Sequence, residues 1–352
     1  MEINKNPNTS IFYLLLFFAV ILAGFLLKSM ASVILPVVFA VLLSFVLFPI
    51  IKKINNKLKI PWVISTLLVF VLFIFIFIGL SSLLVNSLST IVNQYPKYEK
   101  KFMSIYTVLA GSFNMEVDQT KSFIENIWTS LKVREYIQKA AVFLSSGAVS
   151  FGKNFFTIML LAIFLVLEMR ITKDKLHLAF GNDREKVNKI AHQIANETVN
   201  YISIKFFISL ATGILIFIAT KIIGLDFPLV WAFLAFVMNF IPFFGSIISI
   251  ASTTLFSILQ FYPVSIAKPV FILLYMIVVN FGLGNILEPR IEGKNLNLSP
   301  FIILVCLSLW SYLWGFIGMI LAVPMTVIIK IICENIDYLK SIAVILGNKT
   351  DK

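Results

Sequence analysis

Residues 62–84 read WVISTLLVFVLFIFIFIGLSSLL and contain no charged side chain. A helix needs roughly 20 predominantly apolar residues to cross about 30 Å of bilayer hydrocarbon, and this stretch meets that length. Pro61 precedes it as a helix-opening residue, and Trp62 stands where tryptophans anchor membrane helices at the interface. The stretch therefore predicts a transmembrane helix.

The same apolar character extends along the whole chain. Of the 352 residues, 59% are hydrophobic and 13% are charged, and the mean hydropathy is +0.97. A soluble domain is about 45–50% apolar and about 25% charged. We therefore predict an all-α integral membrane protein with about six full transmembrane helices and two broken or re-entrant helical hairpins. The expected full helices cover residues 11–27, 30–51, 62–84, 154–169, 203–222 and 268–287.

The pattern divides the chain into three parts. Residues 1–85 hold three transmembrane helices, and residues 154–352 form the expected transport core with the broken helices. Between them, residues 86–153 are mixed in composition, and Phe123, Ile127 and Leu131 recur at i+4 spacing. This periodicity is typical of amphipathic helices. We expect this part to lie outside the membrane, on the extracytoplasmic side.

Charge indicates the orientation of the chain. The net charge is +12, and Lys52, Lys53, Lys57 and Lys59 directly follow the second apolar segment. Lysine clusters in short loops favour the cytoplasmic side. We therefore attribute the positive net charge to loops that lie against an anionic membrane leaflet. We expect no nucleic-acid partner. Both termini are expected in the cytoplasm.

Enzyme chemistry has no signature in this sequence. There is no G-x-x-x-x-G-K-[ST], G-x-S-x-G or H-E-x-x-H motif, so an ATP motor and common hydrolases are not predicted. Cys306 and Cys333 lie in apolar segments, and His177 and His192 lack ligand-like spacing. We expect no enzyme activity, no cofactor and no metal site.

Two apolar segments, 227–261 and 299–333, are too long for one membrane helix and too short for two crossings and a turn. Each is interrupted near its middle. Broken helices expose backbone groups that lipid cannot satisfy, so they persist where protein or water covers them. We expect a transport pathway here, with these residues shaping the breaks: Asn239, Pro242 and Gly245 in the first, and Gly315 and Gly318 in the second.

A stripe of small residues follows the first break. Gly245, Ser249, Thr253 and Ser257 fall at i+4 spacing, on one face of a helix. Small residues on one face serve close helix packing, which is one interpretation. The other is that the hydroxyls line the pathway, and the sequence leaves both open.

The next span ends in polar residues. Asn280, Gly284 and Glu288 fall at i+4 spacing, with Asn285 beside them and Arg290 two residues later. Polar groups on an apolar membrane helix should face protein or water. Glu288 is therefore either a proton- or ion-coupled gate with Arg290 as counter-ion, or part of a salt-bridged loop that ends the helix at proline. Lys205, near the start of an expected span, is interpreted as snorkelling toward headgroups.

Several segments resemble one family of bacterial membrane proteins, the autoinducer-2 exporter family. The residues are Asn239–Gly245 with its Ile-Pro-aromatic-x-Gly pattern, Asn285–Lys294 with Glu-Pro, Leu298-Ser299-Pro300, Gly315–Pro324, and Leu35-Pro36 with Ser44, Phe45 and Pro49. Near Tyr201 the family often carries a Gly-Gln-like pair, where this chain has Ile204 and Lys205. The resemblance implies a transporter or permease of the bacterial cytoplasmic membrane. Some members export small hydrophilic signalling molecules, and sodium/proton exchange is attributed to others.

Three functions follow as hypotheses. The first is a secondary transporter of a small polar solute, such as an autoinducer-2-like signalling molecule. The second is a sodium/proton antiporter. The third is a non-transporting oligomeric scaffold. The expected partners are the lipid bilayer, the solute or ion, and further copies of the chain.

Overall fold

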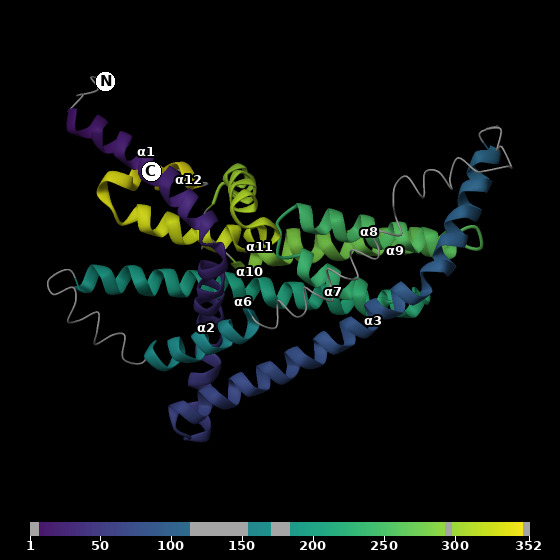
Figure 1. Cartoon of the computed structure of the whole chain (residues 1–352), viewed down its shortest axis with the longest axis horizontal. Coiled ribbons are helices and arrows are strands. Elements are labelled where there is room, and N and C mark those ends of the chain that lie inside the picture. The colour runs from purple at the N-terminus through teal and green to yellow at the C-terminus, as the bar shows by residue number, and fades with distance from the viewer. Residues whose placement is uncertain (1–6, 113–153, 170–183, 293–297, 348–352) are drawn as a thin grey trace. The chain divides into compact units, whose positions relative to one another are not determined.

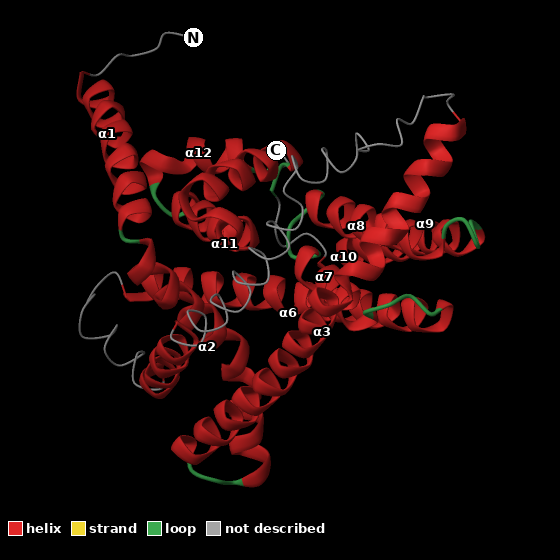
Figure 2. Cartoon of the chain, turned by 45° about the vertical axis from the view of Figure 1, so that its right-hand side comes forward, coloured by secondary structure: helices red, strands yellow, loops and turns green. Residues whose placement is uncertain are grey.

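The structure is a computed structural model that describes residues 7–112, 154–169, 184–292 and 298–347. The described residues are almost entirely helical (Figure 2). Six of their helices are long and apolar enough to cross a membrane. This confirms the predicted all-α membrane class. The predicted amphipathic pattern of Phe123, Ile127 and Leu131 lies outside the described residues.

The chain forms two compact units, each assembled from separated stretches of sequence. The first unit contains residues 1–66, 155–199 and 296–352, and the second contains residues 67–154 and 200–295. Two long helices contribute to both: α3 (Trp62–Ser112) and α6 (Arg184–Ile223). α3 is continuous across residues 85 and 86, where the sequence suggested that the membrane part ends.

The first unit contains α1 (Pro7–Ser29), α2 (Ala31–Leu58), the helix at residues 154–169, α11 (Pro300–Glu334), the 3₁₀ turn η3 (Asp337–Leu339) and α12 (Lys340–Leu346). Ser44 of α2 donates a hydrogen bond to Ala40 O at 2.6 Å and another to Ala162 O at 3.2 Å. The second bond joins α2 to the helix at residues 154–169. Trp314 Nε1 donates to Leu27 O at 2.9 Å and joins α11 to the end of α1.

The second unit contains most of α3 and α6, followed by α7 (Pro228–Met238), α8 (Phe244–Phe261), α9 (Ala267–Asn280), the π-helix η2 (Phe281–Leu287) and α10 (Glu288–Glu292). Figure 1 shows α8 and α9 side by side. Residues from α6, α7 and α9 form the apolar core: Ile216, Ala219, Ala235, Ile272, Met276 and Val279.

Candidate functional site

The first predicted break is a tight helical hairpin. α7 has 11 residues and is about 16 Å long at 1.5 Å per residue, which is about half the thickness of the hydrocarbon. The chain then turns through residues 239–243, and Phe243 has a positive φ of 63°. A Cβ atom on Gly245 would lie 1.7 Å from Met238 O, so only glycine allows this approach of α8 to the end of α7. Pro242 lies within the turn and is partly buried.

The second predicted break has the same construction within α11. Trp314 has φ −130° and ψ 15°, and Gly315 has φ 61° and ψ −140°, a conformation that favours glycine. A Cβ atom on Gly318 would lie 1.9 Å from Trp310 O. Residues eight apart in a continuous helix are separated by about 12 Å, so the chain turns back at this point. The two halves of α11 run in different directions in Figure 1.

The span that ends at Glu288 is irregular. Residues Phe281–Leu287 form a π-helix, a feature that is frequent at functional sites. Asn280 Nδ2 donates to Met276 O at 2.8 Å, Gly284 is partly buried, and Asn285 is exposed. The predicted common face of Asn280, Gly284 and Glu288 assumed α-helical periodicity. The wider turn of the π-helix changes the direction in which Glu288 points relative to Asn280.

Glu288 pairs with Lys205 of α6. Glu288 Oε1 and Lys205 Nζ are 2.5 Å apart, and the two side chains are only 12% and 7% exposed. The prediction that Lys205 snorkels toward headgroups is wrong, because its side chain is buried and its ammonium group is paired with Glu288. A buried ammonium of this kind needs a charged partner, and Glu288 provides it.

Arg290 is therefore not the counter-ion that the sequence suggested. Arg290 is exposed, and no ion pair joins it to Glu288 among the described residues. Residues two apart on a helix point away from each other, which leaves Glu288 directed inward and Arg290 outward. The ion pair of Glu288 in the structure is with Lys205, a partner that the sequence did not suggest.

A second polar contact of α6 reaches the first hairpin. Ser209 lies one turn after Lys205 and accepts a hydrogen bond of 3.0 Å from Asn239 Nδ2, at the break between α7 and α8. Thr212 follows on the same buried face, and its hydroxyl bonds to Ile208 O at 2.9 Å. One face of α6 thus contacts both the broken hairpin and the start of α10. The i, i+4, i+7 spacing of Lys205, Ser209 and Thr212 is the sequence signal that was missed.

The other predicted residues fall into two places. Ser249 and Thr253 are buried on α8, together with Ser257. They lie in the same unit as Asn239 and Glu288, whereas Gly315 and Gly318 belong to the other unit. The structure therefore brings Asn239 and Glu288 to a common helix, α6, and describes the second hairpin as a separate feature.

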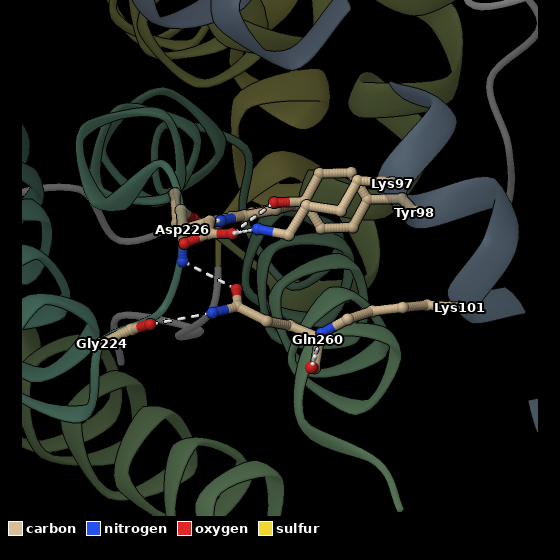
Figure 3. A network of polar contacts seen from close by, with 7 residues as sticks. Lys97, Tyr98, Lys101, Gly224, Asp226 and Gln260 are labelled. Atoms are coloured by element: carbon tan, nitrogen blue, oxygen red, sulfur yellow. Dashed lines mark hydrogen bonds and ion pairs between the residues drawn. The ribbon is translucent and has the colours of Figure 1, made fainter. Parts of the chain in front are cut away.

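A polar network, whose ionisable members all lie outside the expected spans, joins α3 to the end of this core (Figure 3). The Asp226 carboxylate accepts hydrogen bonds from Lys97 Nζ at 3.0 Å and from the Tyr98 hydroxyl at 2.5 Å. The side chain of Gln260 in α8 accepts a hydrogen bond from the backbone N–H of Asp226 at 2.7 Å and donates one to Gly224 O at 2.8 Å. The backbone carbonyl of Gln260 accepts a hydrogen bond from Lys101 Nζ. α3, the α6–α7 loop and α8 are joined here.

Protonation equilibria in the network reflect these contacts. Burial raises the pKa of the Asp226 carboxyl, but the hydrogen bonds from Tyr98 and Lys97 outweigh it, so this pKa lies below its ordinary value. Burial and the bond to Asp226 raise the pKa of the Tyr98 hydroxyl. Asp226 is therefore ionised and Tyr98 is a neutral donor at neutral pH.

Comparisons with known proteins agree on one family. The family described as "AI-2E family transporter" matches residues 14–337. A putative transport protein of Borreliella burgdorferi is 31% identical over 339 residues, covering 96% of this chain and 90% of the relative. A putative transport protein of Haemophilus influenzae is 28% identical, with 94% of each chain covered. The AI-2 transport protein TqsA of Escherichia coli K12 is 26% identical, covering 94% of this chain and 93% of the relative.

Proposed function

This chain belongs to the AI-2E transporter family, and we propose that it is a secondary transporter of a small hydrophilic solute in which Glu288 and Lys205 form the coupling pair. One observation carries the proposal. A buried carboxylate and a buried ammonium meet at 2.5 Å between α6 and the first residue of α10, directly after the π-helix. Charged side chains inside membrane helices are costly, and they typically mark ion or proton pathways.

The pair supplies a physical coupling step. While Glu288 is ionised, it neutralises Lys205. When a proton or a cation binds the carboxylate, Lys205 loses its partner, and an unpaired buried charge is strongly unfavourable. The relative position of α6 and α10 then changes until Lys205 reaches water or another acceptor. Because the next turn of α6 holds Asn239 through Ser209, this movement also acts on the first hairpin.

The solute that we propose to test first is autoinducer-2. This choice is supported by the name of the Escherichia coli relative, an AI-2 transport protein that shares 26% identity. We further propose that the protein resides in the bacterial cytoplasmic membrane with both termini in the cytoplasm. The lysines at the end of α2 support this orientation: Lys52, Lys53, Lys57 and Lys59.

Accumulation in inverted membrane vesicles tests the proposal. Labelled autoinducer-2 should accumulate when a proton gradient is imposed, and only in vesicles that contain the protein. Glu288→Gln should abolish this accumulation while the protein still reaches the membrane. Asp226→Asn is the matched control, since it also neutralises a lysine-paired carboxylate but lies outside the expected spans. Unchanged accumulation and pH dependence in Glu288→Gln would contradict the role of Glu288.

Sodium/proton exchange is the second candidate. Its support is the same carboxylate, because sodium and a proton can compete for Glu288 once Lys205 is displaced. Adding sodium to the same vesicles should then collapse a preformed pH gradient, and Glu288→Gln should prevent the collapse. If neither solute nor sodium is transported, the oligomeric scaffold becomes the preferred function.

A further inference from the structure

A row of hydroxyls on α8 is buried without hydrogen-bond partners in the described part of the chain. Ser249, Thr253 and Ser257 are each at most 1% exposed. None of their hydroxyl oxygens has a partner among the residues that the structure describes. A buried hydroxyl without a partner costs free energy, so such groups call for an explanation.

Helical packing by itself does not explain these hydroxyls. Serine and threonine in membrane helices commonly donate to the carbonyl one turn earlier, and Ser252 of the same helix donates to Ile248 O at 2.5 Å. Thr212 and Thr220 of α6 do the same. The three hydroxyls of the row make no such bond. The described residues therefore leave their hydrogen-bonding capacity unused.

Close approach of the helices explains why the side chains of the row are small, but it does not explain why they carry hydroxyl groups. Gly245 begins the row and lies against the backbone of Met238, where any side chain would collide. Alanine at positions 249, 253 and 257 would allow similar packing without burying a hydroxyl. The hydroxyls thus require a reason beyond fit.

We propose that Ser249, Thr253 and Ser257 form a binding track for an uncharged, hydroxyl-bearing solute, reached when α8 separates from its neighbours during transport. The row carries no ionisable group, so it offers hydrogen bonds but cannot neutralise a charge. Successive members rise by about 6 Å along the helix, a step that lets a small solute pass from one hydroxyl to the next. This inference rests on the proposed transport function and adds the class of solute.

Cysteine accessibility tests the track in membrane vesicles with the full chain. Cys306 and Cys333, the two native cysteines, are first replaced by alanine. Ser249→Cys, Thr253→Cys and Ser257→Cys are then exposed to a membrane-impermeant thiol reagent. Leu255→Cys is the control on the same helix, because Leu255 is 66% exposed on an apolar surface. The row positions should be labelled at least tenfold faster than Leu255→Cys.

Protection identifies the solute. D-ribose at a saturating concentration is an uncharged sugar and should slow the labelling at least threefold. Gluconate, a negatively charged sugar acid, should not slow it. Labelling no faster than that of Leu255→Cys would overturn the track. Labelling that ribose does not slow, or that gluconate slows equally, would overturn the binding of an uncharged solute.

A second pair of variants keeps the test decisive if a cysteine variant does not fold. Ser249→Ala and Thr253→Val should retain the thermal stability of the parent protein and lower the accumulation of labelled autoinducer-2 in inverted vesicles at least tenfold. Unchanged transport would assign the row to packing alone. Because labelling does not depend on coupling, a failure of Glu288→Gln to affect transport would leave the accessibility result intact, so the two proposals fail separately.

Discussion

Lys205 Nζ lies 2.5 Å from Glu288 Oε1, although 83 positions separate the two residues in the chain. The pair joins α6 to the residue at which the π-helix ends. Ser209, one turn along α6, contacts Asn239 at the first hairpin. A change in the charge of Glu288 therefore acts on the helix that holds the break in place.

The pair should be visible in stability as well as in transport. Lys205→Met or Glu288→Gln alone leaves one buried group without its partner, which typically costs about 3–5 kcal/mol. The double variant removes both charges and should recover most of that loss. Thermal unfolding of the detergent-solubilised proteins measures the three variants. Additive losses in the double variant would contradict a direct pairing.

Gly245 and Gly318 should be intolerant of any side chain. A Cβ atom would lie 1.7 Å from Met238 O at Gly245 and 1.9 Å from Trp310 O at Gly318. Overpacking of this kind costs about 1–3 kcal/mol or more, and here the obstacle is backbone. Gly245→Ala and Gly318→Ala should lower the folded yield and the melting temperature. Gly79→Ala is the control, since nothing lies within 4 Å of its added Cβ.

Gly315 is required for a different reason. Nothing lies near its added Cβ, but its φ of 61° with ψ −140° is a conformation that other residues rarely adopt. Gly315→Ala should cost about 1–3 kcal/mol of stability through backbone strain. The melting temperature of Gly315→Ala relative to Gly79→Ala measures this cost. Equal melting temperatures would show that the chain does not turn at this residue.

The Asp226 network should make stability depend on acid. The folded-state pKa of Asp226 lies below its ordinary value of 3.8. Its contribution is therefore complete above that value and is lost as pH falls through the lower folded-state pKa. The contribution should be under about 1 kcal/mol, because Lys97 is half exposed. The difference in melting temperature between the parent and Asp226→Asn should therefore be largest at pH 6 and shrink as pH falls below 3.8, and a difference that stays constant would contradict this prediction.

The membrane fold could be predicted because lipid leaves few alternatives. Uninterrupted apolar stretches must be helical, and glycine and proline clusters mark the places where a helix breaks. Asn239, Gly245, Gly315 and Gly318 were identified on this basis. Close contact between the two halves of each hairpin was not predictable, since it depends on packing between residues seven and eight positions apart.

The charge pair was not predicted because it depends on a contact between distant parts of the chain. The sequence places Lys205 near one end of the expected span 203–222, where a lysine can reach headgroups without a partner, whereas the structure buries it against Glu288. The partner of Lys205 is distant in sequence, and a π-helix sets the direction of Glu288. Hydropathy encodes neither a tertiary contact nor a change in helical period, so Arg290, the nearest opposite charge in sequence, was chosen instead.

Proton flux in proteoliposomes tests the coupling role of Glu288 and Lys205 most directly. Purified protein is reconstituted with a pH-sensitive dye inside, and autoinducer-2 or sodium is added outside. We expect a substrate-triggered change in internal pH for the parent protein and for Asp226→Asn, and none for Glu288→Gln or Lys205→Met. A proton flux equal to that of the parent in both Glu288→Gln and Lys205→Met would contradict a coupling role for the pair.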